Sequence, residues 1–516
     1  MSQQKPDVLL IILDTQRRDR LSVYGHHQNT SPELDAFSTG ATLFERAVAP
    51  AQWTVPAHTS MFTGLYPTTH LVTQANTQLS GSYPTLAEIL QVEGYYTVGF
   101  CNNPLVGVLN NGLQRGFTDF YNYAGAAPNR PLDVRRHGMR RMLSRRWRRF
   151  AQTVSQRFAH SDWLFRVSLH PALTPLWTRY INYKGHTANS ITDLIETLRQ
   201  RRNGEDHHAR QPIFAFLNLM GTHLPYRPPQ DFLPRSALSK DAYRFMSRFN
   251  ADAARWASPV ESPLSAEEQH IIDSYYDAEI MHQDVHLGRL LRYLKDSGAL
   301  ENTLVIIAAD HGEGHGDHDF FGHSFVVYQE LVHVPLIIHY PAHFPVGKRV
   351  GTNVSTRRIF HTILQAAGIK PPLDEADPNG NIDQLTLLRA TNCQPDSEGG
   401  MAFSEAVPPM TMVNTIRHRN PALIDRMNLL QVRRGVYLGD HKLAMVGDHV
   451  EGLFDVDADP AETQNIAAQH APLVTELQGK INAFVQDAAA HRADGSVIET
   501  VSDDVVDNLR ALGYIE

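Results

Sequence analysis

The chain has few cysteines, no long hydrophobic run and no excess of basic residues. Two cysteines, Cys101 and Cys393, among 516 residues exclude a disulfide-stapled scaffold and any zinc module built from several cysteines. Lys and Arg number 47 against 55 Asp and Glu, and the formal net charge of −8 argues against a wholly basic nucleic-acid binder. No stretch approaches the roughly 20 apolar residues that span a bilayer. The apolar run at 8–13 has no basic stretch before it and no small-residue cleavage site after it. It does not resemble a signal peptide, so we expect a soluble, cytoplasmic protein.

Three short apolar runs lead into side chains that are capable of chemistry. Hydrophobic residues make up 42% of the chain and charged residues 20%, which is typical of a globular protein. The runs are residues 8–13 before Asp14, residues 213–220 before His223, and residues 303–309 before Asp310. Each run has the length and composition of a strand buried on both faces. Ligands of open α/β sheets bind beyond the carboxyl ends of the strands, so these three side chains are candidate site residues. For any one of them, a turn-forming residue is the alternative interpretation.

The alternation of apolar runs with helical patterns predicts the fold class. Helices are expected at 85–93, 189–202 and 265–294, between the predicted strands. This order favours an α/β fold with a doubly wound, mainly parallel sheet flanked by helices. From about residue 370 the chain becomes rich in loops, and residues 430–457 alternate as in a small antiparallel sheet before a predicted helix at 471–489. We therefore expect a catalytic domain at 1–370 and a smaller α+β subdomain at 371–516.

A strongly basic segment interrupts the predicted catalytic domain. Residues 130–149 contain nine arginines and one acid, Asp133, within an apparent insertion at about 126–185. Apolar residues recur there at three- and four-residue intervals, which predicts an amphipathic basic helix. The helix could pack as a lid with a solvated arginine face, lie on an anionic membrane surface, or contact a nucleic acid or another acidic partner. The sequence leaves these alternatives open, together with the oligomeric state, a homo-oligomer included.

The segment AQWTVPAHTSMFTG at 51–64 holds the first candidate nucleophile. Thr54 lies at the start of a predicted helix, with Pro56 in its first turn, where proline is tolerated. Threonine is also a good helix N-cap, and that is the structural interpretation of the residue. The functional interpretation is a nucleophile, because a helix N-terminus favours an alkoxide and a bound oxyanion. A threonine hydroxyl needs a base or a metal to activate it.

The segment DHGEGHGDHDFFGH at 310–323 holds the second cluster. Asp310 and His311 are adjacent at a predicted strand end, and His315, His318 and His323 follow on a glycine-rich loop. Carboxylates and imidazoles suit Zn²⁺ or Mn²⁺. A flexible polar loop is the alternative.

Several short motifs occur in a fixed order along most of the chain. They are LDTQRRD at 13–19 with YG at 24–25, TSPELD at 30–35, residues 53–64 with YP at 66–67, THLPY at 222–226, DHGE at 310–313, VPLI at 334–337, LFD at 453–455 with DP at 459–460, and LGY at 512–514. In this order they resemble a sulfatase-type member of the alkaline phosphatase superfamily. The resemblance implies the fold of that superfamily and an ester-bond hydrolase.

The departures from the sulfatase pattern are informative. Family sulfatases carry Cys or Ser, matured to formylglycine, two residues before the motif proline and Arg two residues after it, whereas this chain has Thr54 and His58. A threonine cannot become formylglycine. Thr15 replaces the usual second aspartate of the first motif, and His311 replaces the usual asparagine. Calcium takes six to eight oxygen ligands, so exchanging oxygen donors for an imidazole argues for Zn²⁺ or Mn²⁺.

The resemblance also implies individual site residues. The set Asp14, Thr54, Asp310 and His311 resembles the metal site of the superfamily's phosphoryl-transfer branch, which includes phosphoethanolamine transferases with a metal-bound threonine. His58, His223 and His323 are then expected to stabilise the substrate oxygens during catalysis. Candidate substrate contacts are Asn102 and Asn103, which follow a predicted strand at 97–101, and Lys442, which resembles a lysine near the site in some relatives.

These inferences give a metal-dependent hydrolase of small anionic phosphate or phosphonate esters or diesters, with a covalent phospho-Thr54 intermediate. Three alternatives remain at this point. They are a sulfatase without formylglycine, a phosphotransferase acting on a glycan or lipid, and a non-catalytic binding module.

Overall fold

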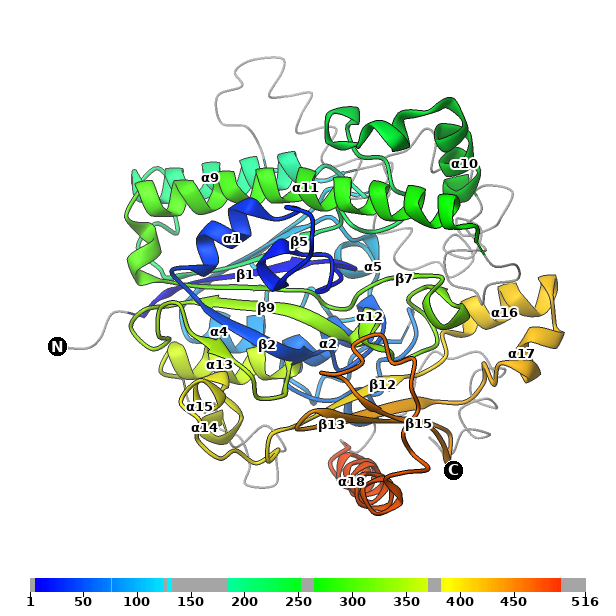
Figure 1. The fold of residues 1–516 in the computed structure, drawn as a ribbon. Helices are drawn as coiled ribbons and strands as arrows, with labels where there is room; N and C mark the ends of the chain where they lie inside the picture. The colour runs from blue at the N-terminus through cyan, green and yellow to red at the C-terminus, as the bar shows by residue number, and fades with distance from the viewer. Residues whose placement is uncertain are drawn as a thin grey trace.

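The computed structural model describes residues 5–75, 77–124, 128–131, 184–251, 264–369 and 382–492. Within these residues a large sheet fills the middle of the molecule, with α9 (Thr187–Arg202) and α11 (Ala266–Asp296) crossing one face (Figure 1). A smaller sheet and α18 (Ala471–Ala490) lie beyond the other face (Figure 1). Among the described residues no helix combines the length and apolar character needed to cross a membrane. The predicted basic helix at 130–149 lies outside the described residues, apart from its first two positions.

The large sheet is mainly parallel, as the sequence predicts. Its strand order is β10-β2-β9-β6-β1-β5-β3-β4, and β11 also pairs with β2. The central strand β1 pairs in parallel with β5 and β6, whereas β9 runs antiparallel to β2 and β6. The strands are β1 (Asp7–Leu13), β2 (Thr42–Val48), β3 (Tyr96–Cys101), β4 (Asp119–Asn122), β5 (Ile213–Leu219), β6 (Thr303–Ala308), β9 (His333–His339), β10 (Arg349–Val350) and β11 (Val354–Ser355).

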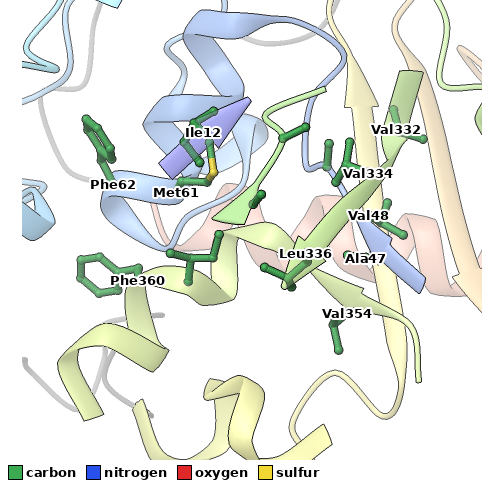
Figure 2. Packing of buried hydrophobic residues seen from close by; sticks show 14 of the residues in the cluster. Ile12, Ala47, Val48, Met61, Phe62, Val332, Val334, Leu336, Val354 and Phe360 are labelled. Atoms are coloured by element: carbon green, nitrogen blue, oxygen red, sulfur yellow. The ribbon is translucent and has the colours of Figure 1, made fainter. Parts of the chain in front are cut away.

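Side chains of β1 alternate between two separate cores. Val8, Leu10 and Ile12 face one cluster, which includes residues of α2 (Thr54–Thr63), α4 (Leu86–Val92) and α13 (Ile359–Ala366). Figure 2 shows part of this cluster, where Ile12, Met61, Phe62 and Phe360 lie. Leu9, Ile11 and Leu13 face the other cluster, with apolar residues of α9 and α11. A strand sends successive side chains to opposite faces, so a sheet covered on both sides needs the continuous apolar run that the sequence shows.

The predicted helices are present, with small differences at their ends. Ser265 caps α11 and Thr85 caps α4, each through a capping box that also involves the glutamate three residues later. At α2 the sequence allowed Thr54 to be the N-cap. The structure instead has Trp53 at that position and Thr54 as the first helical residue, with no side-chain hydrogen bond capping the helix. The Thr54 hydroxyl is therefore free for the contacts described below.

The smaller sheet is antiparallel and contains one strand that the sequence did not predict. Its order is β12 (Met401–Ala406), β13 (Arg433–Leu438), β14 (His441–Val446) and β15 (His449–Asp455). The unpredicted strand β12 pairs with β13 and joins the sheet to the catalytic core, because the Glu405 N–H donates to the Pro50 carbonyl at 3.0 Å. The helix α18 packs on this sheet through Leu477 and Ile481, as expected. The proposed boundary near 370 falls at 370–381, outside the described residues.

Candidate active site

Four neighbouring strands bring polar side chains to one edge of the large sheet. Asp14 follows β1, Asp310 lies just beyond β6, and Asn102 and Asn103 follow β3. His223 comes four residues after the end of β5. Because β6, β1, β5 and β3 are adjacent and parallel, their carboxyl ends meet at this edge. The three apolar runs singled out in the sequence therefore deliver their side chains to a common place.

Asp14, Asp310 and His311 form a group suited to a metal ion. One ligand atom from each residue lies within 4.8 Å of the others, and all three side chains are fully buried. The Nδ1 of His311 lies 2.9 Å from the Gly312 carbonyl oxygen, which can only accept. Nδ1 therefore carries a proton, and Nε2 is the ring nitrogen that could bind a cation. Of the residues that the structure describes, these three make the one such group with at least three His, Cys, Asp or Glu ligands.

One oxygen of each carboxylate accepts hydrogen bonds from N–H groups, and the other accepts none among the described residues. Asp310 Oδ1 accepts the N–H groups of Thr15 at 3.2 Å and His311 at 3.0 Å. Asp14 Oδ2 accepts from Asn103 at 2.7 Å and from Asn218 at 3.1 Å. Asp14 Oδ1 has no hydrogen-bond partner among the described residues, and Asp310 Oδ2 accepts none there but lies 3.3 Å from His311 Nε2 and 3.4 Å from His58 Nδ1. Buried carboxylate oxygens without partners are costly, and a bound cation would satisfy both. The residues present thus fit a divalent metal.

The pKa shifts of Asp14 and His311 indicate that this group of side chains lacks a positive charge. Burial and the nearby Asp310 carboxylate raise the pKa of Asp14 above its ordinary value. Burial also lowers the basicity of an imidazole, but Asp310 and Asp14 outweigh it and raise the pKa of His311 to about 9. Two buried acids and one imidazole share this space, so a proton occupies the place that a cation would take.

Thr54 lies beside this group. Its Oγ1 is 3.3 Å from His311 Nε2 and 3.4 Å from Asn103 Nδ2, and the residue is 1% exposed. Asn103 is itself held in place, because its Oδ1 accepts the Leu105 N–H at 2.8 Å. The structure therefore brings together Asp14, Thr54, Asp310 and His311, the four residues that the sequence proposed as one site. Asn103 joins them through its bonds to Asp14 and Thr54.

Two further histidines adjoin His311. The rings of His311 and His323 have centroids 4.5 Å apart, and those of His323 and His223 are 5.1 Å apart. His323 Nδ1 lies 2.7 Å from Glu313 Oε1, which fixes the orientation of the ring. Burial and the neighbouring His323 lower the pKa of His223. The imidazoles of His223 and His323 thus line the same edge of the sheet as Asp14, Asp310 and His311, which are called the metal-type group below.

Asn102 is at the edge but makes no side-chain hydrogen bond. Its amide is fully buried, and neither its Oδ1 nor its Nδ2 has a partner among the described residues. The backbone N–H of Asn102 donates to the Asn218 carbonyl at 3.1 Å, which continues the pairing of β3 with β5. The buried amide therefore has an unused donor and an unused acceptor among the described residues.

His58 contacts both Thr54 and Asp310. Its ring is fully buried and packs edge-on against Phe62 and Phe216. Nδ1 donates to the Thr54 carbonyl at 2.9 Å and lies 3.4 Å from Asp310 Oδ2. Burial lowers the pKa of His58, so the ring is neutral near pH 7. The contacts of His58 are those of a residue that positions Thr54 and Asp310, not those of a cationic substrate ligand.

Lys442 is held in a buried ion pair of the smaller sheet. Its Nζ is 2.6 Å from Glu462 Oε1 and donates to the Val327 carbonyl at 2.5 Å, and its side chain is fully buried. The sequence proposed Lys442 as a substrate contact. The structure gives this ammonium to Glu462 and Val327 and does not join it to the metal-type group.

Comparison with known proteins agrees with this geometry. The profile of the sulfatase family matches residues 6–369. The chain belongs to the sulfatase family. It is 22% identical over 385 residues to an arylsulfatase of Clostridium perfringens, covering 72% of this chain and 74% of that one. It is 25% identical over 508 residues to arylsulfatase K of Bos taurus, covering 93% and 82%.

Solved structures share the fold of this sulfatase-family chain. The phosphonate monoester hydrolase of Agrobacterium radiobacter superposes with a TM-score of 0.64 at 22% identity, over 97% of this chain and 99% of that one. The phosphonate monoester hydrolase SpPMH of Silicibacter pomeroyi gives a TM-score of 0.63 at 19% identity, over 97% and 98%. The expected alkaline-phosphatase-like fold and an ester-bond hydrolase are confirmed.

Proposed function

We propose that this protein is a metal-dependent hydrolase of phosphate or phosphonate esters in which Thr54 is the nucleophile. The observation that carries the proposal is the distance of 3.3 Å between Thr54 Oγ1 and His311 Nε2, beside the free oxygens of Asp14 and Asp310. A sulfatase that uses formylglycine needs Cys or Ser at this position. With threonine there, the attacking oxygen has to be the side-chain hydroxyl itself.

Zn²⁺ and Mn²⁺ are the cations that this donor set favours. Two carboxylates and a neutral imidazole are typical ligands of these metals, whereas Ca²⁺ takes six to eight oxygens. A divalent cation held by Asp14, Asp310 and His311 would supply a Lewis acid that lowers the pKa of a neighbouring hydroxyl and offsets phosphoryl charge. The metal-type group is the feature of this chain that supports such a role.

The residues of the chain have distinct parts in the proposed reaction. Thr54 loses its proton to solvent as Oγ1 attacks phosphorus, and the bond from phosphorus to the leaving oxygen breaks. The leaving oxygen keeps the electron pair and takes up a proton. Asn103 Nδ2, 3.4 Å from Oγ1, donates to the developing alkoxide, and the N-terminus of α2 adds its positive dipole end. Water then attacks the phospho-threonine, which restores the hydroxyl and releases the second product.

His323 and His223 are the groups suited to hold the equatorial oxygens. Both rings neighbour His311, and Glu313 orients His323 through the 2.7 Å contact to its Nδ1. Donors that are already oriented before the reaction stabilise charge that develops in the transition state. Asn102 is a further candidate, because its buried amide has a free donor and a free acceptor.

Hydrolysis of sulfate esters is the second candidate function. The family profile and the arylsulfatases among the relatives favour it. A panel of p-nitrophenyl phosphate, bis-p-nitrophenyl phosphate, p-nitrophenyl phenylphosphonate and p-nitrophenyl sulfate separates the two functions. We expect the highest kcat/KM on one of the phosphorus esters, with the protein loaded with Mn²⁺ or Zn²⁺. Turnover of the sulfate ester alone would replace the proposal with the second candidate.

A further inference from the structure

Asn218 is a polar residue in an otherwise apolar strand. It lies in β5 (Ile213–Leu219) and is fully buried. Its side chain follows those of Phe214 and Phe216 on the face of the sheet that packs against α2. The position is next to the carboxyl end of the strand, where the metal-type group lies. No feature of the sequence had singled Asn218 out.

The amide of Asn218 donates to two groups at once. Its Nδ2 is 3.1 Å from Asp14 Oδ2 and 3.3 Å from His58 Nε2. His58 Nδ1 donates to the Thr54 carbonyl, so Nε2 of the neutral ring carries a lone pair and can accept. An ionised Asp14 can also only accept. Both contacts require a donor, and together they determine which end of the amide is the nitrogen.

Asn218 and Asn103 therefore act on Asp14 in the same way. Each sends one N–H to Asp14 Oδ2, and each sends its other N–H to a second part of the site. For Asn103 that second part is the hydroxyl of Thr54, and for Asn218 it is the ring of His58. With Oδ2 held from two sides, Asp14 presents Oδ1, which has no hydrogen-bond partner among the described residues.

The arrangement has a cost that packing alone does not explain. Asn218 Oδ1 is also buried without a hydrogen-bond partner in the described part of the chain. Leaving such an acceptor unsatisfied costs about 1–3 kcal/mol. A leucine, which has the same number of side-chain heavy atoms and also branches at Cγ, would avoid the cost in a strand where the adjacent residues are Leu217 and Leu219. The hydrogen bonds to Asp14 and His58 are interactions that a leucine could not make.

We propose that Asn218 is a positioning residue of the metal site, which holds Asp14 so that Oδ1 faces the cation and holds His58 in its Nδ1–H tautomer against the Thr54 carbonyl. The proposal rests on the metal-binding part of the proposed function. It does not depend on which ester is cleaved. Groups that orient metal ligands commonly change metal affinity by about 10–100-fold when they are lost.

The test is a titration of the metal-free, full-length protein with Mn²⁺ alone, by calorimetry, without any substrate. Asn218→Leu is expected to weaken Mn²⁺ binding by about 10–100-fold while the metal-free protein melts at the same temperature or higher. Asn218→Ala serves as a second variant in case leucine disturbs folding, and the same weakening is expected.

The matched control is Asn122→Leu. Asn122 ends β4, which is separated from β5 by β3, is also buried, and among the described residues bonds only to Ala124 through its side chain. The Asn122→Leu variant should be less stable than wild type but bind Mn²⁺ with the wild-type affinity.

The outcomes separate this inference from the proposed function. If wild type binds Mn²⁺ and both Asn218 variants bind it equally well, Asn218 is only a packing residue and the inference is overturned, while the proposed function stands. If wild type binds no divalent metal, both are overturned. Weaker Mn²⁺ binding in the Asn218 variants supports the inference, even if the substrate panel assigns the enzyme to sulfate esters.

Discussion

The hydroxyl oxygen of Thr54 lies 3.3 Å from Nε2 of His311, a residue 257 positions further along the chain. His311 donates its Nδ1–H to the Gly312 carbonyl, so Nε2 is the nitrogen that faces Thr54 and that could bind a cation in place of a proton. One ligand atom of each of Asp14, Asp310 and His311 lies within 4.8 Å of the others. The candidate nucleophile is thus in contact with a candidate metal ligand, as a hydroxyl activated by a metal must be.

Removal of the Thr54 hydroxyl should abolish turnover without emptying the metal site. We expect Thr54→Val to lower kcat/KM by roughly 10³-fold or more on the best ester of the panel. Metal content, measured by mass spectrometry after dialysis, should stay close to that of wild type. The control is Thr59→Val on the same helix, since Thr59 is buried and its hydroxyl, within the described part of the chain, donates only to the Val55 carbonyl at 2.8 Å. Full activity of Thr54→Val would remove Thr54 as the nucleophile.

Removal of the metal should inactivate the enzyme reversibly. After treatment with EDTA, we expect Zn²⁺ or Mn²⁺ to restore activity better than Ca²⁺, because one of the three ligands is an imidazole. A cation that binds only the folded state also stabilises it, by about 2.7 kcal/mol at 100 times its Kd, so the same ions should raise Tm. His311→Ala should abolish this rise. Recovery with Ca²⁺ alone would favour a calcium site of the kind that the family's oxygen ligands form.

The metal-type group could be predicted from the sequence because both of its aspartates come directly after apolar runs that are recognisable as strands. Asp14 and Asp310 come directly after apolar runs, and parallel strands end at a common edge. The order of the strands was less accessible, because it depends on which strands pair and not on the composition of any one of them. The strand β12 (Met401–Ala406) was missed for a related reason. It is short, it follows a loop-rich stretch, and its pairing partner β13 begins at Arg433.

Roles carried over from relatives were harder to predict than positions. His58 and Lys442 occupy matching places in the motif order, but a side chain's role depends on what packs around it. His58 is enclosed by Phe62, Phe216 and Asn218, and Lys442 is neutralised by Glu462. Asn218 carries a signal that could have been used. A single amide within a strand otherwise made of Ile, Phe, Ala and Leu costs free energy to bury, so its presence indicates that it makes specific contacts.

Stability at low pH should depend on Asp273. Burial favours its neutral form, but the contact with His315 Nδ1 at 3.3 Å, together with the charges of Arg20 and Arg17, outweighs burial and lowers the pKa of Asp273 to about 2. The unfolded chain has the ordinary value, near 3.9. A lowered folded-state pKa means that Asp273 stabilises the fold above about pH 4 and that this contribution is lost as the pH falls towards 2.

Asp273→Asn should therefore lower Tm at pH 7, where we expect a loss of about 1–2 kcal/mol from this partly buried site. The difference in Tm between wild type and variant should shrink as the pH is lowered from 4 to 2.5. Thermal unfolding followed by circular dichroism at a series of pH values measures it. A difference that stays constant over this range would show that Asp273 is not ionised differently in the folded and unfolded states.

The buried pair of Lys442 and Glu462 should support stability and not substrate binding. Both side chains are fully buried with their charged atoms 2.6 Å apart, and Glu462 Oε2 also accepts the Gln329 N–H at 2.6 Å. Removing one partner leaves an uncompensated charge in the interior, so Lys442→Met should lower the free energy of unfolding by about 3–5 kcal/mol. The double variant Lys442→Met with Glu462→Gln should recover most of this loss, because no charge is left and the glutamine oxygen can still accept from Gln329. Urea unfolding measures the stability, and KM for the best ester of the panel measures substrate binding. We expect the double variant to keep the wild-type KM, whereas a rise in KM at recovered stability would return Lys442 to the substrate site that its place in the sequence suggested.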